Sequence, residues 1–340
     1  MSALAERAPA ARPSRPRLAF LGVGWIGRHR LQAVAEGGLA EIAALVDPSA
    51  EMVSEAARIA PGARGAASLD ELDLEDLDGV VIATPTALHA EQAIAALDRG
   101  LAVFCQKPLG RNAAEVAAVI AAARRADRLL GVDLSYRHTA AMRAIRERLA
   151  AGAIGEVHAI DLVFHNAYGP DKAWFYDPRL SGGGCVVDLG VHLVDLVLWA
   201  LDLPEVRGVS SRLFAGGRPL VDPGSQVEDY AVATLDLEGG AVARLACSWR
   251  LQAGCDAVIS ASFYGTGGGL EFRNVGGSFY DFVAVRFAGP ARETLTRPPD
   301  DWGGRAAADW AGRLAAGEGF DEGVCRQQEV ARVLDAIYGR

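Results

Sequence analysis

The stretch Leu-Ala-Phe-Leu-Gly-Val-Gly-Trp-Ile-Gly, residues 18–27, decides the fold class of this 340-residue chain. Its first four residues are apolar and predict a buried strand, and a helix-like segment follows the last glycine. G-x-G-x-x-G between a strand and a helix is the context in which this motif binds a dinucleotide, although a plain structural turn is the alternative. Gly22 permits the tight turn, Gly24 lets the backbone approach a pyrophosphate, and Gly27 allows close packing of helix on strand. The loop residues that we expect to contact the cofactor are Gly22, Gly24, Trp25, Ile26 and Gly27.

The type of dinucleotide is indicated by Asp47, which ends the second predicted strand twenty residues after Gly27. A carboxylate at this place accepts hydrogen bonds from the ribose hydroxyls of NAD. It would repel the 2′-phosphate of NADP, and the next three residues, Pro48, Ser49 and Ala50, include no arginine to bind that phosphate. The sequence therefore favours NAD over NADP.

The first part of the chain alternates short apolar runs with alanine-rich, helix-like stretches. Strands that are apolar throughout, separated by helices, indicate a parallel sheet covered on both faces. We interpret residues 18–137 as a doubly wound α/β domain, the Rossmann architecture. The runs that predict its strands are residues 18–21, 42–46, 80–83, 101–105 and 129–134.

The second part, residues 138–340, has strand-like runs that follow one another with tight-turn signals between several of them. This pattern predicts an α+β domain with a large open, mostly antiparallel sheet. We expect helices over residues 140–151, 185–201 and 321–338. Residues 1–17 hold four arginines and three prolines without the apolar segment of a secretory signal, and we interpret them as a disordered leader.

The overall composition excludes some classes of function. The chain is 51% hydrophobic and 23% charged with a net charge of −9, which is typical of a globular protein and argues against a nucleic-acid partner. No apolar run approaches the roughly 20 residues that a membrane span needs. The five cysteines are scattered without a C-x-x-C pair, which is typical of reduced thiols and predicts a cytoplasmic protein.

The predicted helix over residues 185–201 is apolar except for glycine and three ionisable residues, Asp188, His192 and Asp195. A helix that is apolar nearly all round is buried, and buried ionisable groups are costly unless they are paired or used. The spacing places all three on one stripe, so Asp188 can approach His192 and set its tautomer for acid–base chemistry. A structural His–Asp pair in the core and a metal site are the alternatives, and we favour no metal. For Asp195 we expect a structural role.

These features together resemble the Gfo/Idh/MocA family of NAD(P)-dependent sugar and cyclitol oxidoreductases. The matching motifs are the glycine loop, Ala83-Thr84-Pro85-Thr86 with His89, Lys107-Pro108, and Gly182-Gly183-Gly184 through Asp188-x-Gly190-x-His192. The resemblance implies a cis Lys107–Pro108 bond and an open sheet that forms homodimers or homotetramers. Where the family usually has Glu-Lys-Pro, this chain has Gln106-Lys107-Pro108, which changes the local charge.

The resemblance also implies a catalytic set of Lys107, Asp188 and His192. We hypothesise that His192 accepts the hydroxyl proton of a secondary alcohol, Asp188 orients His192, and Lys107 stabilises the developing alkoxide. The same three residues would contact the substrate. The residues placed beside the cofactor on this basis are Thr84, Pro85, His89, Gln106 and Lys107.

Further substrate contacts are expected from Arg137, at the end of the last strand of the first domain, and from His165 and Tyr168 in a polar, aromatic segment. Such groups suit a polyhydroxylated ring, although an ordinary interface loop is the alternative. The leading interpretation is an NAD-dependent dehydrogenase acting on a sugar, sugar derivative or inositol. The alternatives are a redox-neutral NAD-dependent lyase or glycosidase, and a non-catalytic NAD- or sugar-binding regulator.

Overall fold

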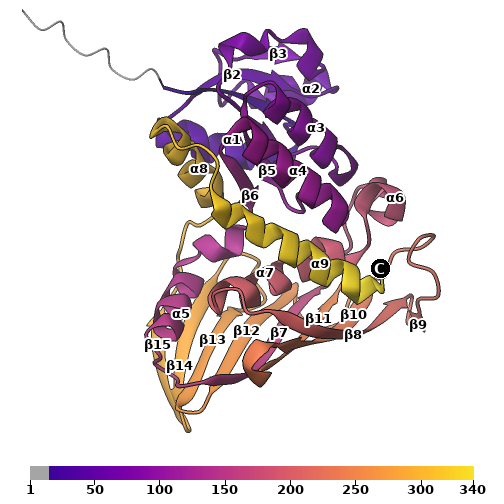
Figure 1. The fold of residues 1–340 in the computed structure, drawn as a ribbon, viewed down its shortest axis with the longest axis vertical. Coiled ribbons are helices and arrows are strands. Elements are labelled where there is room, and N and C mark those ends of the chain that lie inside the picture. Colours follow the sequence, from indigo (N-terminus) through magenta and orange to yellow (C-terminus); the bar gives the residue numbers. More distant parts are fainter. Residues whose placement is uncertain (1–14) are drawn as a thin grey trace, which may run out of the picture.

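The computed structural model describes residues 15–340 of the chain. Residues 1–14, most of the expected leader, lie outside this range. The described residues form two sheets, one above the other in Figure 1, with helices between and around them. The first strand already begins at Arg17.

The first sheet has six parallel strands in the order β3-β2-β1-β4-β5-β6. This confirms the doubly wound Rossmann architecture that the sequence predicted. Its strands are β1 (Arg17–Leu21), β2 (Glu41–Val46), β3 (Arg64–Ala66), β4 (Gly79–Ile82), β5 (Ala102–Gln106) and β6 (Leu130–Asp133). The helices that connect them are α1 (Trp25–Gly37), α2 (Ala50–Ala56), α3 (Thr86–Asp98) and α4 (Ala113–Ala126).

The strands of this sheet are apolar throughout because both of their faces are buried. In β1, Leu18 and Phe20 belong to one hydrophobic cluster, whereas Ala19 and Leu21 belong to a second cluster on the other face. Alternate side chains of a strand point to opposite faces, so a sheet covered on both sides needs apolar residues at every position.

The second sheet has nine strands in the order β15-β14-β13-β12-β7-β11-β10-β8-β9. Neighbouring strands are antiparallel except β7 and β11, which confirms the mostly antiparallel open sheet. β13 and β15, which complete hairpins at one edge, were not predicted from the sequence. The strands are β7 (Val157–Asn166), β8 (Val206–Ala215), β9 (Arg218–Pro219), β10 (Tyr230–Leu237), β11 (Val242–Ser248), β12 (Ala257–Gly265), β13 (Gly268–Asn274), β14 (Phe282–Ala288) and β15 (Ala291–Thr296).

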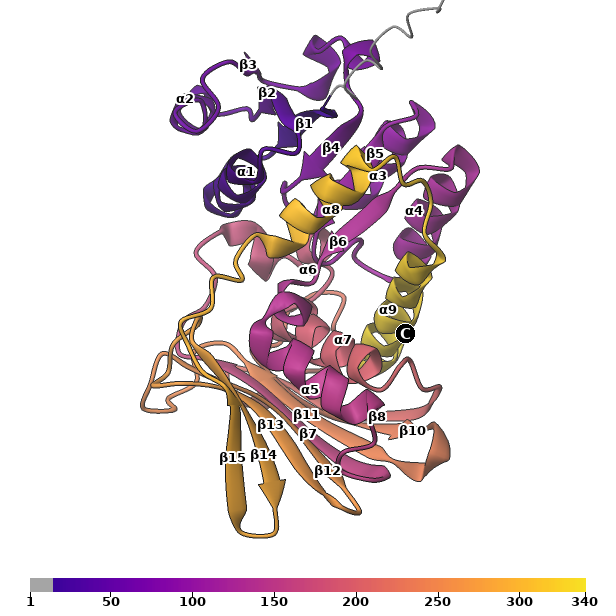
Figure 2. The same cartoon turned by 90° about the vertical axis from the view of Figure 1, so that its left-hand side faces the viewer.

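One face of the second sheet is covered by three helices that separate it from the first sheet, as Figure 2 shows from the side. Ile160, Leu162 and Phe164 of β7 point to this face and are buried in its core. The opposite face carries no helix within the described chain (Figure 2). The covering helices are α5 (Ala140–Ala150), α7 (Val191–Ala200) and α9 (Arg326–Tyr338).

The last helices return to the first sheet. α8 (Arg305–Ala315), which the sequence analysis did not predict, packs against α1, β5 and β6, and its Trp310 is buried in the cluster that holds Phe20. α9 contacts α4 of the first domain as well as α7 and β8 of the second. Helices from the end of the chain thus complete the layer that covers the first sheet.

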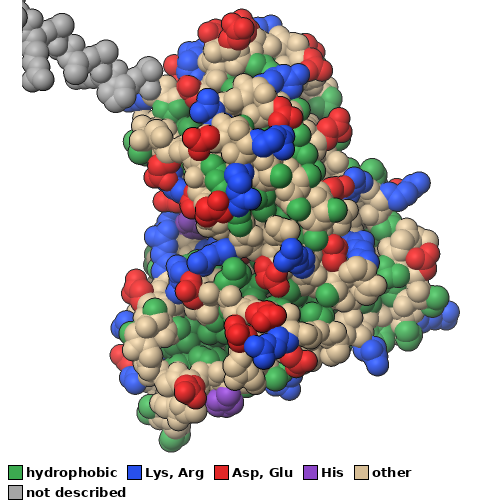
Figure 3. Space-filling model, in the orientation of Figure 1, with side chains coloured by type: hydrophobic (Ala, Val, Ile, Leu, Met, Phe, Trp, Pro, Cys, Tyr) green, Lys and Arg blue, Asp and Glu red, His purple; other side chains and the backbone are tan. Residues whose placement is uncertain are grey.

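Short helical segments fill the connections. They are η1 (Leu69–Glu71), η2 (Leu74–Asp76), η3 (Ser135–His138), η4 (Ala173–Tyr176), α6 (Pro178–Ser181), η5 (Val186–Gly190), η6 (Glu238–Gly240) and η7 (Glu322–Cys325). The helical stretch from Pro178 to Ala200 matches a membrane span in length and hydropathy, but 89% of its most apolar window is buried in the protein, as in a core helix. On the face drawn in Figure 3, acidic and basic side chains are interspersed over both domains.

Candidate active site

The glycine loop joins β1 to α1 at the carboxyl edge of the first sheet. Gly22 has φ of +80°, and a Cβ there would lie 2.6 Å from the carbonyl oxygen of Ala83. A Cβ on Gly27 would lie 2.0 Å from the carbonyl oxygen of Gly22. Around Gly24, in contrast, an added Cβ meets nothing within 4 Å. Two glycines are therefore required by the fold, and the third leaves open space beside the backbone.

The surroundings of this loop fit the phosphates and ribose of a dinucleotide. α1 begins at Trp25, which is 63% exposed, and its first turn contains no acidic residue. Its free N–H groups and partial positive charge thus remain available to an anion. Asp47 lies beside the loop: its carboxylate accepts hydrogen bonds from Val23 N at 3.0 Å and from Ser49 N at 2.9 Å.

The Thr84-Pro85 turn follows β4 at the same edge of the sheet, and α3 begins directly after it. His89 of α3 is buried between this turn and the next one. Its Nδ1 lies 2.7 Å from the Pro108 carbonyl oxygen and its Nε2 lies 2.7 Å from the Thr84 carbonyl oxygen. Both ring nitrogens are thereby occupied, so His89 supports the two turns and leaves no ring nitrogen for a cofactor.

Lys107 follows β5 and connects the two domains. The Lys107–Pro108 peptide bond is cis. Lys107 Nζ donates to Asp188 Oδ1 at 2.7 Å and to the Asp188 carbonyl oxygen at 2.6 Å. The two side chains are 17% and 18% exposed, so the ion pair is held within the protein yet can be reached from outside.

Asp188 lies in η5, a single π-helical turn that precedes α7. Such turns are rare and often occur at functional sites. The second carboxylate oxygen of Asp188 accepts a hydrogen bond from Trp249 Nε1 at 3.0 Å. Lys107 and Trp249 thus hold one oxygen each. The structure does not show the expected Asp188–His192 pair, because Asp188 is turned toward groups from the other domain and from the end of β11.

His192 lies one turn further along, in α7. It is buried, and the Tyr136 ring packs edge-to-face against it with the two ring centroids 4.9 Å apart. Burial, together with the positive charges of Lys107 and Arg30, holds the pKa of His192 well below its usual value. The imidazole is therefore neutral at pH 7 and can accept a proton.

The start of the π-helical turn η5 is fixed by Glu228, a residue that was not singled out from the sequence. Its carboxylate is buried and accepts hydrogen bonds from Gly184 N at 3.1 Å, Val186 N at 2.8 Å and the Tyr338 hydroxyl at 2.7 Å. The free N–H groups at the beginning of η5 are thus satisfied. Burial raises the pKa of Glu228, and these hydrogen bonds oppose the increase.

Gln106 lies between Lys107 and the neighbouring strand β6. Its Oε1 accepts a hydrogen bond from the Lys107 backbone N–H at 3.0 Å, and its Nε2 donates to Asp133 Oδ2 at 2.9 Å. Asp133 is also paired with Arg30 of α1. The residue that departs from the usual motif is therefore part of a buried polar network.

The three additional substrate candidates are not brought to the Lys107–Asp188 pair. Arg137 forms a two-bond ion pair with Asp195, in agreement with a structural role for Asp195. His165 hydrogen-bonds Ser248 and stacks on Tyr230, on the sheet face opposite the helices, because its neighbour Phe164 points into the core.

Tyr168, the third candidate, is 56% exposed in a loop beyond β7. Its hydroxyl donates to Asp256 Oδ1 at 2.5 Å, and this hydrogen bond raises the pKa of the phenol. The aromatic residue that the structure does bring to Asp188 is Trp249. The only signal for it in the sequence was its position directly after a predicted strand.

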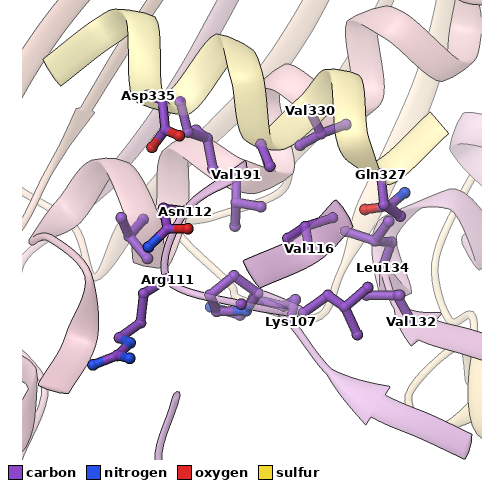
Figure 4. Close-up of a pocket in the computed structure, with 16 residues that line it drawn as sticks. Lys107, Arg111, Asn112, Val116, Val132, Leu134, Val191, Gln327, Val330 and Asp335 are labelled. Atoms are coloured by element: carbon purple, nitrogen blue, oxygen red, sulfur yellow. The ribbon is translucent and has the colours of Figure 1, made fainter. Parts of the chain in front are cut away.

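A cavity of about 20 Å³ lies behind Lys107, where α9 covers the junction between the domains (Figure 4). Figure 4 shows Gln327, Val330 and Asp335 on α9 at one side and Val116 and Leu134 at the other. This volume is enough for about one water molecule, so this cavity is too small for a sugar. Within residues 15–340, no three His, Cys, Asp or Glu side chains gather as metal ligands would.

Two family models cover most of the chain. Residues 17–134 match the oxidoreductase family with an NAD-binding Rossmann fold, and residues 142–271 match the GFO/IDH/MocA C-terminal domain. The chain belongs to the Gfo/Idh/MocA family. It is an oxidoreductase with an NAD-binding Rossmann domain.

Individual relatives of this Gfo/Idh/MocA protein act on sugars or inositol. It is 29% identical to 1,5-anhydro-D-fructose reductase of Ensifer adhaerens, over 76% of each chain. It is 27% identical to inositol 2-dehydrogenase 4 of Saccharopolyspora erythraea, over 93% of this chain and 94% of that one. A structure of levoglucosan dehydrogenase with NADH and levoglucosan has the same fold, with a TM-score of 0.80 at 23% identity over 95% and 96% of the two chains.

Proposed function

We propose that this Gfo/Idh/MocA protein is an NAD-dependent dehydrogenase that oxidises a secondary alcohol of a sugar, a sugar derivative or an inositol, or reduces the corresponding ketone. The observation that carries the proposal is the ion pair of Lys107 and Asp188 beside the neutral His192. It joins a lysine at the carboxyl edge of the cofactor-binding sheet to the helix that carries a base.

The reaction needs a hydride acceptor and a base. The nicotinamide of NAD accepts the hydride when bound. His192 is the group that takes the hydroxyl proton, because its lowered pKa keeps it neutral. Lys107 donates a hydrogen bond to the oxygen that becomes negatively charged, and Asp188 holds the Lys107 ammonium group in place. Asp188 therefore acts through Lys107, whereas the sequence had suggested that it acts through His192.

The composition of the chain supports a specific need for lysine at position 107. Of its 34 basic residues, only Lys107 and Lys172 are lysines. Lys172 is an exposed loop residue paired with Asp171. A single compact ammonium group can enter a narrow site as a point charge, whereas the planar guanidinium of arginine cannot replace it there.

The preference for NAD rests on Asp47 and its neighbours. Asp47 is fixed at the loop by two backbone N–H groups, so its negative charge stays where a 2′-phosphate would come. Arg28, a basic side chain on α1 that also contacts the carbonyl oxygen of Val23 in the loop, is paired with Glu55 at 2.8 Å. We infer that the residues which hold the dinucleotide are Gly22, Gly24, Trp25, Ile26, Gly27, Asp47, Thr84 and Pro85.

The substrate class is proposed from the relatives, which include an anhydro-sugar reductase and an inositol dehydrogenase. The test is a panel of sugars, sugar derivatives and cyclitols incubated with the purified protein and either NAD or NADP. We expect one class to produce NADH in proportion to the substrate consumed, and the Lys107→Met variant to produce almost none. Substrate consumption without NADH would favour a redox-neutral lyase or glycosidase. NAD and sugar binding without turnover would favour a regulator.

We also propose that the uncovered face of the second sheet binds a second copy of the chain. Phe214, Tyr230 and His165 lie on that face, where the aromatic rings are only partly buried. Light scattering of the purified protein tests this: a dimer or tetramer is expected, and a monomer at micromolar concentration would contradict it.

A further inference from the structure

Gln106 and Asp133 are 27 residues apart and lie opposite each other at the ends of the paired strands β5 and β6. Asp133 is fully buried. Its Oδ1 accepts from the Ser135 hydroxyl at 2.6 Å, and its Oδ2 accepts from Arg30 Nε at 2.5 Å and Gln106 Nε2 at 2.9 Å. The buried carboxylate of Asp133 is thus neutralised by the Arg30 guanidinium and fixes the Gln106 amide by a hydrogen bond.

The amide group of Gln106 uses both of its ends. Nε2 donates to Asp133, and Oε1 turns back to accept from the backbone N–H of Lys107. A carboxamide is the side-chain group that can donate at one end and accept at the other in this way. A leucine or methionine here would leave the Lys107 N–H and one lone pair of Asp133 without these partners.

A glutamate at position 106 is excluded by Asp133 rather than by Lys107. Its carboxylate would replace the donor Nε2 with an oxygen about 3 Å from Asp133 Oδ2. Two carboxylates at that distance, one of them fully buried, cannot both stay ionised beside one guanidinium, so one must take up a proton or move away. In either case the hydrogen bond that links β6 to Lys107 is changed.

We propose that Gln106 is a positioning residue for Lys107, that Asp133 is the reason for its amide, and that the two act as one unit with Arg30. The carboxylate that the usual Glu-Lys-Pro motif carries on β5 is supplied in this chain by Asp133 from the neighbouring strand. This inference rests on the proposed dehydrogenase function, because Lys107 is the group being positioned.

A double-mutant cycle tests the unit, with Gln106→Glu, Asp133→Asn and both changes together. The single change Q106E brings two carboxylates together, and D133N leaves Arg30 buried without its counter-charge. The double variant carries one carboxylate and one amide again, at two positions that both adjoin the place of Asp133 Oδ2, the atom that pairs with Arg30. We expect each single variant to lose kcat and the double variant to regain it, with a coupling factor of about tenfold.

The control is Gln32→Glu. Gln32 Nε2 also donates to a carboxylate, that of Glu36 at 2.5 Å, but both residues are exposed on α1. Solvent screens that pair of charges, so we expect wild-type kcat. The KM for NAD should stay within about twofold in all variants, because no atom of the unit belongs to the glycine loop or Asp47. Single effects that simply multiply in the double variant would overturn the proposal.

The free energy of unfolding, measured for the same variants, tests the Gln106–Asp133 unit independently of whether the protein is a dehydrogenase. Coupling in stability without any dehydrogenase activity in the wild type would refute the function but retain the Gln106–Asp133 unit. If a charge variant does not fold, Gln106→Met gives the answer, because it adds no charge and leaves the Arg30–Asp133 pair intact. Loss of kcat at unchanged NAD affinity is expected for Q106M, and unchanged kcat would overturn the positioning role.

Discussion

Lys107 Nζ hydrogen-bonds both the Oδ1 atom and the carbonyl oxygen of Asp188, at 2.7 Å and 2.6 Å. One ammonium group thus connects the end of β5 in the first domain to the π-helical turn in the second. The connection depends on the position of both domains, because neither sheet alone carries both partners.

Replacing Lys107 with methionine should lower kcat by about two to three orders of magnitude, the usual effect of removing one donor to a developing oxyanion. Lys107→Arg should be little more active than the methionine variant, because the planar guanidinium group does not fit the position of the compact ammonium group. Steady-state kinetics and NADH binding by fluorescence measure this. The matched control is Lys172→Met, on an exposed loop, and equal losses in both methionine variants would contradict the role of Lys107.

The pH dependence of kcat should reflect the neutral state of His192. Its pKa is lowered by burial and by Lys107 and Arg30, so it stays able to accept a proton below the ordinary imidazole value. Activity should therefore fall on acidification only below about pH 6.5, the unperturbed pKa of histidine. A kcat profile in the oxidative direction checks this, and the small residual activity of His192→Asn should show no acid limb. An acid limb centred above pH 7 would rule out the assignment.

The preference between cofactors should depend on Asp47. Asp47→Ser removes the negative charge and the ribose acceptor, so NADH should bind about tenfold more weakly while NADPH binding improves. Titration of both reduced cofactors by fluorescence gives the two dissociation constants. Glu51→Gln, an exposed acidic residue in the first turn of α2, is the control that removes a charge of the same sign nearby. An unchanged ratio of the constants in D47S would show that another residue excludes NADP.

Glu228 should matter for stability more than for cofactor binding. Glu228→Ala leaves three buried donors without their acceptor and should cost about 3 kcal/mol of unfolding free energy. Tyr338→Phe removes one of those donors and should cost about 1 kcal/mol. Urea unfolding at pH 7 provides the values, with the exposed Glu238→Ala as control. A cost for E228A no larger than for the control would mean that the start of η5 is fixed by other contacts.

The isosteric variant Glu228→Gln should change how stability depends on pH. The pKa of Glu228 is raised in the folded protein, so the folded state binds a proton more readily than the unfolded state. Its contribution is present below the unfolded pKa of about 4.3 and is lost as the pH rises through the folded value. Relative to wild type, E228Q should therefore become more stable as the pH is raised, and a constant difference from pH 4 to pH 8 would contradict this.

The parts of the fold that could be predicted from the sequence are those marked by a pattern within one short segment. The parallel strands were recognisable because both faces are buried, and the glycine loop because Gly22 and Gly27 leave no space for a Cβ. α8 was missed because its place on the first sheet is decided by a contact with β5 and β6, far away in the chain.

The same distinction holds for the site. Lys107, Asp188 and His192 were recognisable, but the expected Asp188–His192 pair assumed a regular helix and no partner from outside it. Lys107 and Trp249 approach Asp188 from 81 and 61 residues away, and no spacing rule predicts them. His165 is different, because strand alternation from the apolar Phe164 already indicated the face opposite the helices.

The return of α8 to the first sheet bears on how members of this family can exchange parts. A cut at residue 137 would divide the chain between its two sheets, yet it would remove Trp310 from the cluster that contains Leu18, Phe20 and Phe104. A functional chimera with a relative must therefore transfer two separate segments together, the first sheet and the helix that covers it. Recombination at a single crossover would pair the first sheet of one protein with the covering helix of another, so the side chains around position 310 would no longer match the cluster that they enter.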